Sequence, residues 1–142
     1  MAAFNKINQF VEDLAKKVHN LGTSADQLVI ALCASAYAPV ATNTVLANLT
    51  QIAYTNCSSR NLTISASAQS SGTYKLSITD LVLTASGGDI AAFRYVVIYN
   101  DTPTSPADPL IGWYDYGASV TITNGNTFTI DFDGSAGVLT IA

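Results

Sequence analysis

From residue 26 onward, short apolar runs alternate with turn-forming residues along the whole chain. The run at 27–33 is almost wholly apolar, which predicts a strand buried on both faces. We expect further strands at 50–54, 60–66, 73–85, 91–100, 110–116, 119–123, 127–133 and 138–141, and one helical turn at 44–49. Short strands separated by turns about every 8 to 12 positions are typical of a single-domain β-sandwich, of the jelly-roll or immunoglobulin-like kind.

Two of these strands carry large residues on both faces. In the strand at 91–100, Phe93, Tyr95, Val97 and Tyr99 alternate with Arg94, Val96 and Ile98. We therefore expect 91–100 to pair with 110–116 in the middle of a sheet, across the loop 101–109. A surface that binds ligands such as sugars stays open as an alternative, because Asp101, Asp108 and Asp115 lie near these aromatic residues in the sequence.

Two local signals refine the strand pattern. Asn124-Gly125 is a strong signal for a tight β-hairpin, which would join the strands at 119–123 and 127–133. Within 73–85 the apolar positions change phase after Asp80, as a β-bulge would produce.

Residues 3–21 carry the one long helical pattern of the chain. Its apolar residues recur at steps of three and four: Phe4, Ile7, Phe10, Val11, Leu14, Val18 and Leu21. Gly22 follows as a stop signal. We expect residues 1–22 to form an amphipathic helical arm on a β-sandwich domain of residues 23–142. The apolar stripe would pack on that domain or reach a neighbouring subunit.

The composition excludes several classes of partner. The net charge is −4 and only 11% of residues are charged, against about 25% in typical soluble domains. Because the chain is acidic, it should bind phosphate groups poorly, and we expect no nucleic-acid partner. No apolar run approaches the roughly 20 residues of a membrane span, and the start has no apolar signal-peptide core, so we expect synthesis in the cytosol and no membrane partner. Cys33 and Cys57 are expected to be reduced and buried.

Residues that could perform catalysis or bind metal are scarce. The one histidine, His19, is expected on the polar side of the helix near its end, with no Ser, Cys or Asp partner set. Asp131 and Asp133 fall on one face of a strand, which indicates a solvated face or, alternatively, a cation at a subunit junction. No nucleotide-binding or nucleophile motif is present. We expect no enzyme activity, no cofactor and no metal.

Three segments carry a family resemblance: "APVATNTVLANLTQIAYTN", "SSGTYKLSITDLVLTASGG" and "FRYVVIYNDTP…PLIGWYDYGASVTITNGNTFTIDFDGSAGVLTIA". The chain resembles a group of small virion proteins of tailed bacteriophages, encoded among the head and tail structural genes. The resemblance implies a head decoration (cement) protein on the capsid exterior, a homotrimer that binds the major capsid protein. A tail component (adaptor or tail-tip subunit) and a glycan-binding virion module are the alternatives.

We expect eight residues of the arm and of two loops to form the protein interface: Phe4, Ile7, Phe10, Val11, Leu14, Tyr37, Asp101 and Asp108.

Overall fold

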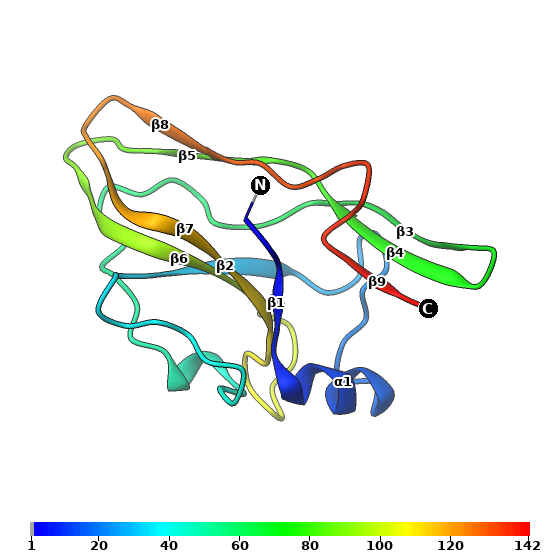
Figure 1. Cartoon of the computed structure of the whole chain (residues 1–142). Coiled ribbons are helices and arrows are strands. Elements are labelled where there is room, and N and C mark those ends of the chain that lie inside the picture. The colour runs from blue at the N-terminus through cyan, green and yellow to red at the C-terminus, as the bar shows by residue number, and fades with distance from the viewer. Residues whose placement is uncertain (1) are drawn as a thin grey trace.

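The computed structural model describes residues 2–142 and is mainly β, with 45% of residues in strands and one short helix. In chain order (Figure 1), the elements are β1 (Asn5–Lys6), α1 (Asn8–Ala15), β2 (Leu28–Cys33), the 3-10 turn η1 (Leu46–Asn48), β3 (Ile64–Ser70), β4 (Thr73–Ile78), β5 (Leu81–Thr84), β6 (Ile90–Asn100), β7 (Leu110–Ile122), β8 (Thr127–Ile130) and β9 (Leu139–Ile141). Between residues 2 and 142, no helix combines the length and apolar character needed to cross a membrane.

The largest sheet has four antiparallel strands in the order β1-β7-β6-β2. The expected pairing of 91–100 with 110–116 is confirmed, with Val97 opposite Trp113. β7 continues to Ile122 and so includes the strand expected separately at 119–123. The last six residues of β6 are all buried, as expected for a strand with large residues on both faces.

β2 is also buried along its whole length, as the apolar run at 27–33 predicts. Its outer edge is covered by an irregular segment at 52–62. The Ile52 amide donates to the Leu32 carbonyl (2.9 Å), and the Leu62 amide donates to the Leu28 carbonyl (2.8 Å). The strand expected at 50–54 is therefore irregular chain, and the one expected at 60–66 starts only at Ile64.

Two smaller sheets, β3-β4-β9 and β5-β8, complete the fold. The Asn124-Gly125 turn forms, with Gly125 at φ 83° and the Asn126 amide bonded to the Thr123 carbonyl (3.0 Å). The expected hairpin is nevertheless wrong, because β8 pairs with β5 and the turn leads from one sheet to another. Phe128 of β8 lies opposite Leu83 of β5 and packs edge-on against Phe93 of β6 (ring centroids 5.5 Å apart).

The phase change after Asp80 has a similar explanation. β4 ends at Ile78 and pairs with β3 and β9, whereas β5 begins at Leu81 and pairs with β8. The chain thus changes sheets at 79–80, and the bulge expected within one strand is wrong.

The helix expected at 3–21 is much shorter in the structure. Asn5 pairs with Trp113 of β7, and the Ile7 amide donates to the Ile111 carbonyl (3.1 Å), so the chain enters α1 from a strand. The helix ends at Ala15, and Lys17 has a left-handed backbone (φ 63°). Six of the seven apolar residues at this spacing are buried or half-buried, although the chain there is a short strand, a helix and a loop: Phe4, Ile7, Phe10, Leu14, Val18 and Leu21. The division of the chain at residue 22 stays a prediction.

Candidate protein interface

An apolar groove of about 280 Å³ lies between α1 and β9. Four of the five predicted arm residues border it: Phe4, Phe10, Val11 and Leu14. Leu139, Thr140 and Ile141 of β9 form its other wall. The fifth arm residue, Ile7, is fully buried in the core of its own chain, and so is not available to a partner.

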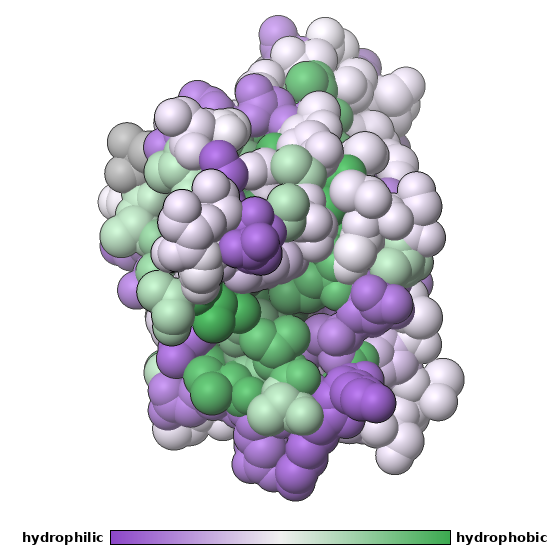
Figure 2. Space-filling view, turned by 90° about the vertical axis from the view of Figure 1, so that its right-hand side faces the viewer, coloured by the Kyte–Doolittle hydropathy of each residue, from purple (hydrophilic) through white to green (hydrophobic). Residues whose placement is uncertain are grey.

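A second hollow of about 250 Å³ continues this groove. Its lining includes Leu21 and Tyr74, and it shares Leu14 and Ile141 with the first hollow. We call the two together the α1–β9 surface. Figure 2 faces this side of the molecule and shows hydrophobic side chains gathered in a hollow with hydrophilic ones around it.

The α1–β9 surface has two properties of a protein-binding site. Its residues Val11 and Ile141 are 53% and 40% exposed, which is high for large aliphatic side chains. Two edge strands border it, because β9 pairs only with β4 and β1 only with β7 among the described residues. Open strand edges carry unpaired backbone groups that can bind an extended segment of another protein.

The chain segments that hold the predicted loop residues, after β2 and between β6 and β7, lie at the same end of the molecule as α1 (Figure 1). Tyr37 is 53% exposed and borders a shallow hollow with Val40. Asp101 is exposed, whereas Asp108 is half-buried. Partial burial raises the pKa of Asp108, and the nearby Asp101 carboxylate raises it further. The Asp108 carbonyl accepts the Leu46 amide (2.9 Å), which ties the loop to η1.

A buried polar cluster joins the segment after α1 to the end of β6. His19 is only 6% exposed, so its expected place on a polar helix face is wrong. Its Nδ1 lies 3.2 Å from Nδ2 of Asn100, which also donates to Oδ2 of Asp26 (2.7 Å). Burial lowers the pKa of His19 against the opposing effect of Asp13 and Asp26. The sequence did not predict the contacts of Asn100 with His19 and Asp26, because an asparagine at the end of a strand is common before a turn.

Asp133 and the two cysteines, which were the other candidates for metal binding or reactivity, lie in turns or in the core of the fold. Oδ1 of Asp133 accepts the amides of Ser135 (2.9 Å) and Ala136 (2.7 Å), which orders the turn before β9. Cys33 is buried and Cys57 half-buried, and the two thiols are not joined. Burial raises the pKa of the Cys33 thiol to about 11. Among residues 2–142, no three or more His, Cys, Asp or Glu side chains are grouped so that they could hold a metal ion.

The structure thus brings together most of the predicted arm residues and adds partners that sequence reasoning missed. Leu139 and Ile141 were expected only as a final strand, without an interface role. No protein family, curated protein or solved structure matches this chain. The phage resemblance therefore remains a prediction.

Proposed function

We propose that the protein is a decoration (cement) protein of a tailed-phage head, which binds the outer surface of the major capsid protein and stabilises the head. The α1–β9 surface is the observation that carries the proposal. An exposed apolar groove bordered by two strand edges suits binding to another protein better than binding to a small polar molecule.

The charge of the surface is consistent with a protein partner. Among residues 2–142, Lys6 is the one charged residue that lines the two hollows, in a chain of net charge −4. The groove therefore suits an apolar segment and tolerates an acidic residue near Lys6. The proposed role is binding without catalysis.

We further propose that the protein acts as a homotrimer with closed cyclic symmetry and that its sheets form a jelly-roll or immunoglobulin-like sandwich. The edge-on contact of Phe93 with Phe128 supports two packed layers, because it joins β6 to β8. A closed ring lets a small domain bury a large area per subunit. Each bound copy would stabilise the head by mass action, since it binds the intact shell and not the ruptured one.

The proposal is tested by co-sedimentation with heads of the encoding phage prepared without this protein. The wild-type chain is expected to bind and to raise the temperature at which the heads rupture. Val11→Glu places a charge on the apolar groove and should weaken binding by about tenfold or more, because burying an unpaired carboxylate is costly. Val82→Glu is the matched control, since Val82 is 49% exposed and lies on β5, outside the α1–β9 surface.

Two outcomes would contradict different parts of the proposal. Heads that do not bind the wild-type chain would exclude the decoration role. Equal binding of wild type and Val11→Glu would exclude the α1–β9 surface as the contact. The tail alternative is tested by counting copies per virion, because a decoration protein follows the number of capsomers whereas a tail subunit forms a single ring.

A further inference from the structure

The strand β3 is an outer strand of the sheet β3-β4-β9, and its outer edge is unpaired in the part of the chain that the structure describes. It presents seven residues, whereas the outer strands β1 and β9 present two and three. Five of the seven are exposed, and the β3–β4 hairpin reaches past the rest of the fold at one end (Figure 1). A free edge of this length carries unpaired backbone groups that can pair with another strand.

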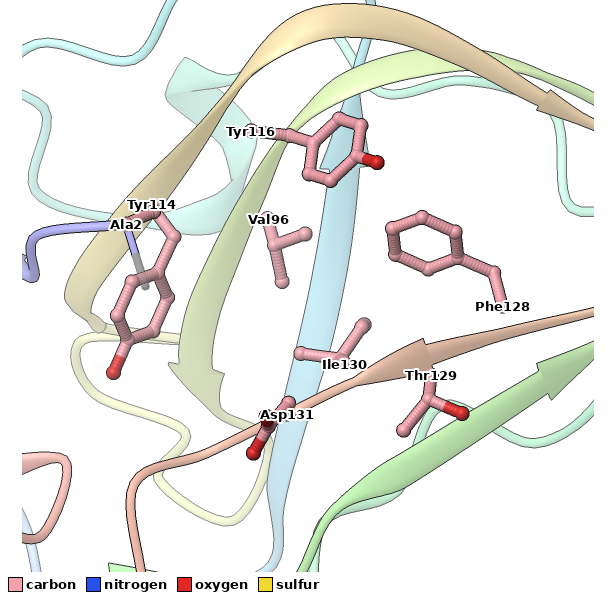
Figure 3. Close-up of a pocket in the computed structure, with 8 residues that line it drawn as sticks. All are labelled: Ala2, Val96, Tyr114, Tyr116, Phe128, Thr129, Ile130 and Asp131. Atoms are coloured by element: carbon pink, nitrogen blue, oxygen red, sulfur yellow. The ribbon is translucent and has the colours of Figure 1, made fainter.

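β8 is an outer strand too, but large side chains lie between it and the four-stranded sheet. Its Phe128 packs edge-on against Tyr116 of β7 (ring centroids 5.3 Å apart) and against Phe93 of β6. Figure 3 shows Tyr114, Tyr116 and Phe128 in the space between β7 and β8. β3 carries mostly serine and alanine instead, so another backbone can approach its edge closely.

The edge of β3 lacks most of the features that protect free strands from pairing. Edge strands are commonly protected by charged side chains, by proline or by a bulge. Residues 61–74 contain neither a charged residue nor a proline. The register of β3 against β4 shifts between Ile64 and Ala66, and this irregularity affects only the start of the strand. Residues 66–70 are therefore a regular and unprotected edge.

The turn between β3 and β4 indicates which backbone groups of β3 point outward. Ser71 and Gly72 both have positive φ (51° and 85°), as in a type I′ turn, so the two residues that flank them form a hydrogen-bonded pair. Hydrogen-bonded and non-hydrogen-bonded pairs alternate along an antiparallel ladder. The N–H and C=O groups of Ser67 and Gln69 therefore point away from β4.

We propose that the free edge of β3 binds the same edge of a second copy of this chain, antiparallel, about a two-fold axis at Ala68. Ser67 of each copy then lies opposite Gln69 of the other, and each such pair exchanges both of its backbone hydrogen bonds. Ala68 lies opposite its own counterpart in the closer, non-hydrogen-bonded pair, where a small side chain fits. The contact joins the two three-stranded sheets into one continuous sheet.

Charge favours a second copy as the occupant of this edge. Two copies of an acidic chain repel each other, but no like charges meet where two uncharged strands pair. Lys75 is the one charged residue in the three strands of this sheet, and it lies on β4 opposite Ala68. The two Lys75 residues of the pair would be three strand spacings apart, roughly 14 Å, which exceeds the screening length in physiological salt.

This inference goes beyond the decoration role and does not depend on it. Ser67 also lines the α1–β9 surface, but through its side chain, which bonds to the Tyr74 hydroxyl (2.9 Å). The β3 contact uses the backbone of Ser67 instead. Where the closed ring proposed above forms, the β3 contact joins two rings.

The test is analytical ultracentrifugation of the full chain over a series of concentrations. Gln69→Pro removes an N–H that faces the second copy and not β4, so the variant should fold and its sedimenting mass should be half that of wild type. Gln69→Ala is the matched control, because it loses the same side chain, including the bond to the Gly72 amide, but keeps the N–H. It should sediment as wild type. Ser67→Pro and Ser67→Ala form a second pair with the same expectations.

Hydrogen exchange of the wild-type chain gives a readout that needs no variant. The amides of Ser67 and Gln69 should exchange more slowly as the protein concentration rises, because only the second copy protects them. The proposal is overturned if these amides exchange at the same rate at every concentration, or if both proline variants sediment as wild type. Circular dichroism shows whether each variant is folded, and binding of Gln69→Pro to phage heads tests the decoration role separately.

Discussion

The ring of Phe4 lies directly over Gly112, so that a Cβ atom on residue 112 would fall 2.2 Å from Cζ of Phe4. The same atom would fall 2.7 Å from the carbonyl oxygen of Asn5. The absent side chain of Gly112 is therefore what allows β1 to pair with β7, and it also sets the position of Phe4 in the α1–β9 surface.

We expect Gly112→Ala to displace β1 and to lower the free energy of unfolding by about 1–3 kcal/mol, the usual cost of overpacking. Urea denaturation measures this change. Gly134→Ala is the control, because a Cβ atom at 134 meets no heavy atom within 4 Å. If the two variants unfold at the same urea concentration, the contact with Phe4 does not constrain the fold.

The buried His19 should make stability depend on pH near neutrality. Burial lowers its folded-state pKa, whereas the unfolded chain keeps a pKa of about 6.5. Below pH 6.5 the unfolded state therefore binds more protons, and the free energy of unfolding falls by at most about 1.4 kcal/mol per pH unit. Urea titrations at pH 7.5, 6.5 and 5.5 should show this slope in wild type. The slope should be smaller in His19→Gln, and an equal slope would assign the effect to other groups.

Asp115 should contribute to stability in a more acidic range. Arg94 of β6 donates two hydrogen bonds to Asp115 of β7, from Nε to Oδ1 (2.7 Å) and from Nη2 to Oδ2 (2.9 Å). The hydrogen bonds from Arg94 lower the pKa of Asp115 most, and the hydrogen bond from the Gly117 amide lowers it further. Its contribution is complete above the unfolded pKa of about 3.9 and is lost as the pH falls through the folded pKa.

Asp115→Asn removes this contribution, so its unfolding midpoint should lie below that of wild type at pH 6 and approach it near pH 2.5. The side chains of Arg94 and Asp115 are 30% and 38% exposed, so added salt should reduce the difference. A difference that is the same at both pH values would contradict the assignment.

The covered edge of β2 gives a further prediction. The Tyr54 hydroxyl accepts the Leu32 amide (2.9 Å) and donates to Gln51 (2.7 Å), while the Arg60 guanidinium lies 3.6 Å from the Tyr54 ring centroid. Burial raises the pKa of Tyr54 to about 12, so this phenol stays protonated at neutral pH.

Tyr54→Phe leaves the Leu32 amide without its partner and should lower the free energy of unfolding by about 1–3 kcal/mol. Hydrogen exchange at Leu32 should become faster. Tyr37→Phe serves as the control, because surface substitutions usually change stability by less than about 0.5 kcal/mol. Unchanged exchange at Leu32 would show that the hydroxyl does not protect this edge.

Local patterns predict the strands of this chain better than their partners. The apolar run at 27–33 and the two-sided strand at 91–100 predict buried strands, and both predictions are confirmed. The Asn124-Gly125 turn also forms, yet its following strand pairs with β5. A turn signal depends on a few adjacent residues, whereas strand pairing depends on which apolar faces meet in the whole chain.

The N-terminal segment shows the same limit. Its spacing of three and four includes residues that are buried, such as Phe10 and Leu21, but also Val11, which is exposed. It does not identify the backbone, because a short strand, a short helix and a loop satisfy the same spacing. β7 decides the outcome, since its edge accepts Asn5 and Lys6 as a strand.

The sequence by itself determined that the chain is mainly β and identified Phe4, Val11 and Leu14 as apolar residues available for contact. Only the tertiary structure placed Ile141 beside Leu14 and packed Tyr116 against Phe128. The physical reason is distance along the chain. Strand character follows from neighbouring residues, whereas a binding surface forms only where segments far apart in the sequence bury their apolar faces together.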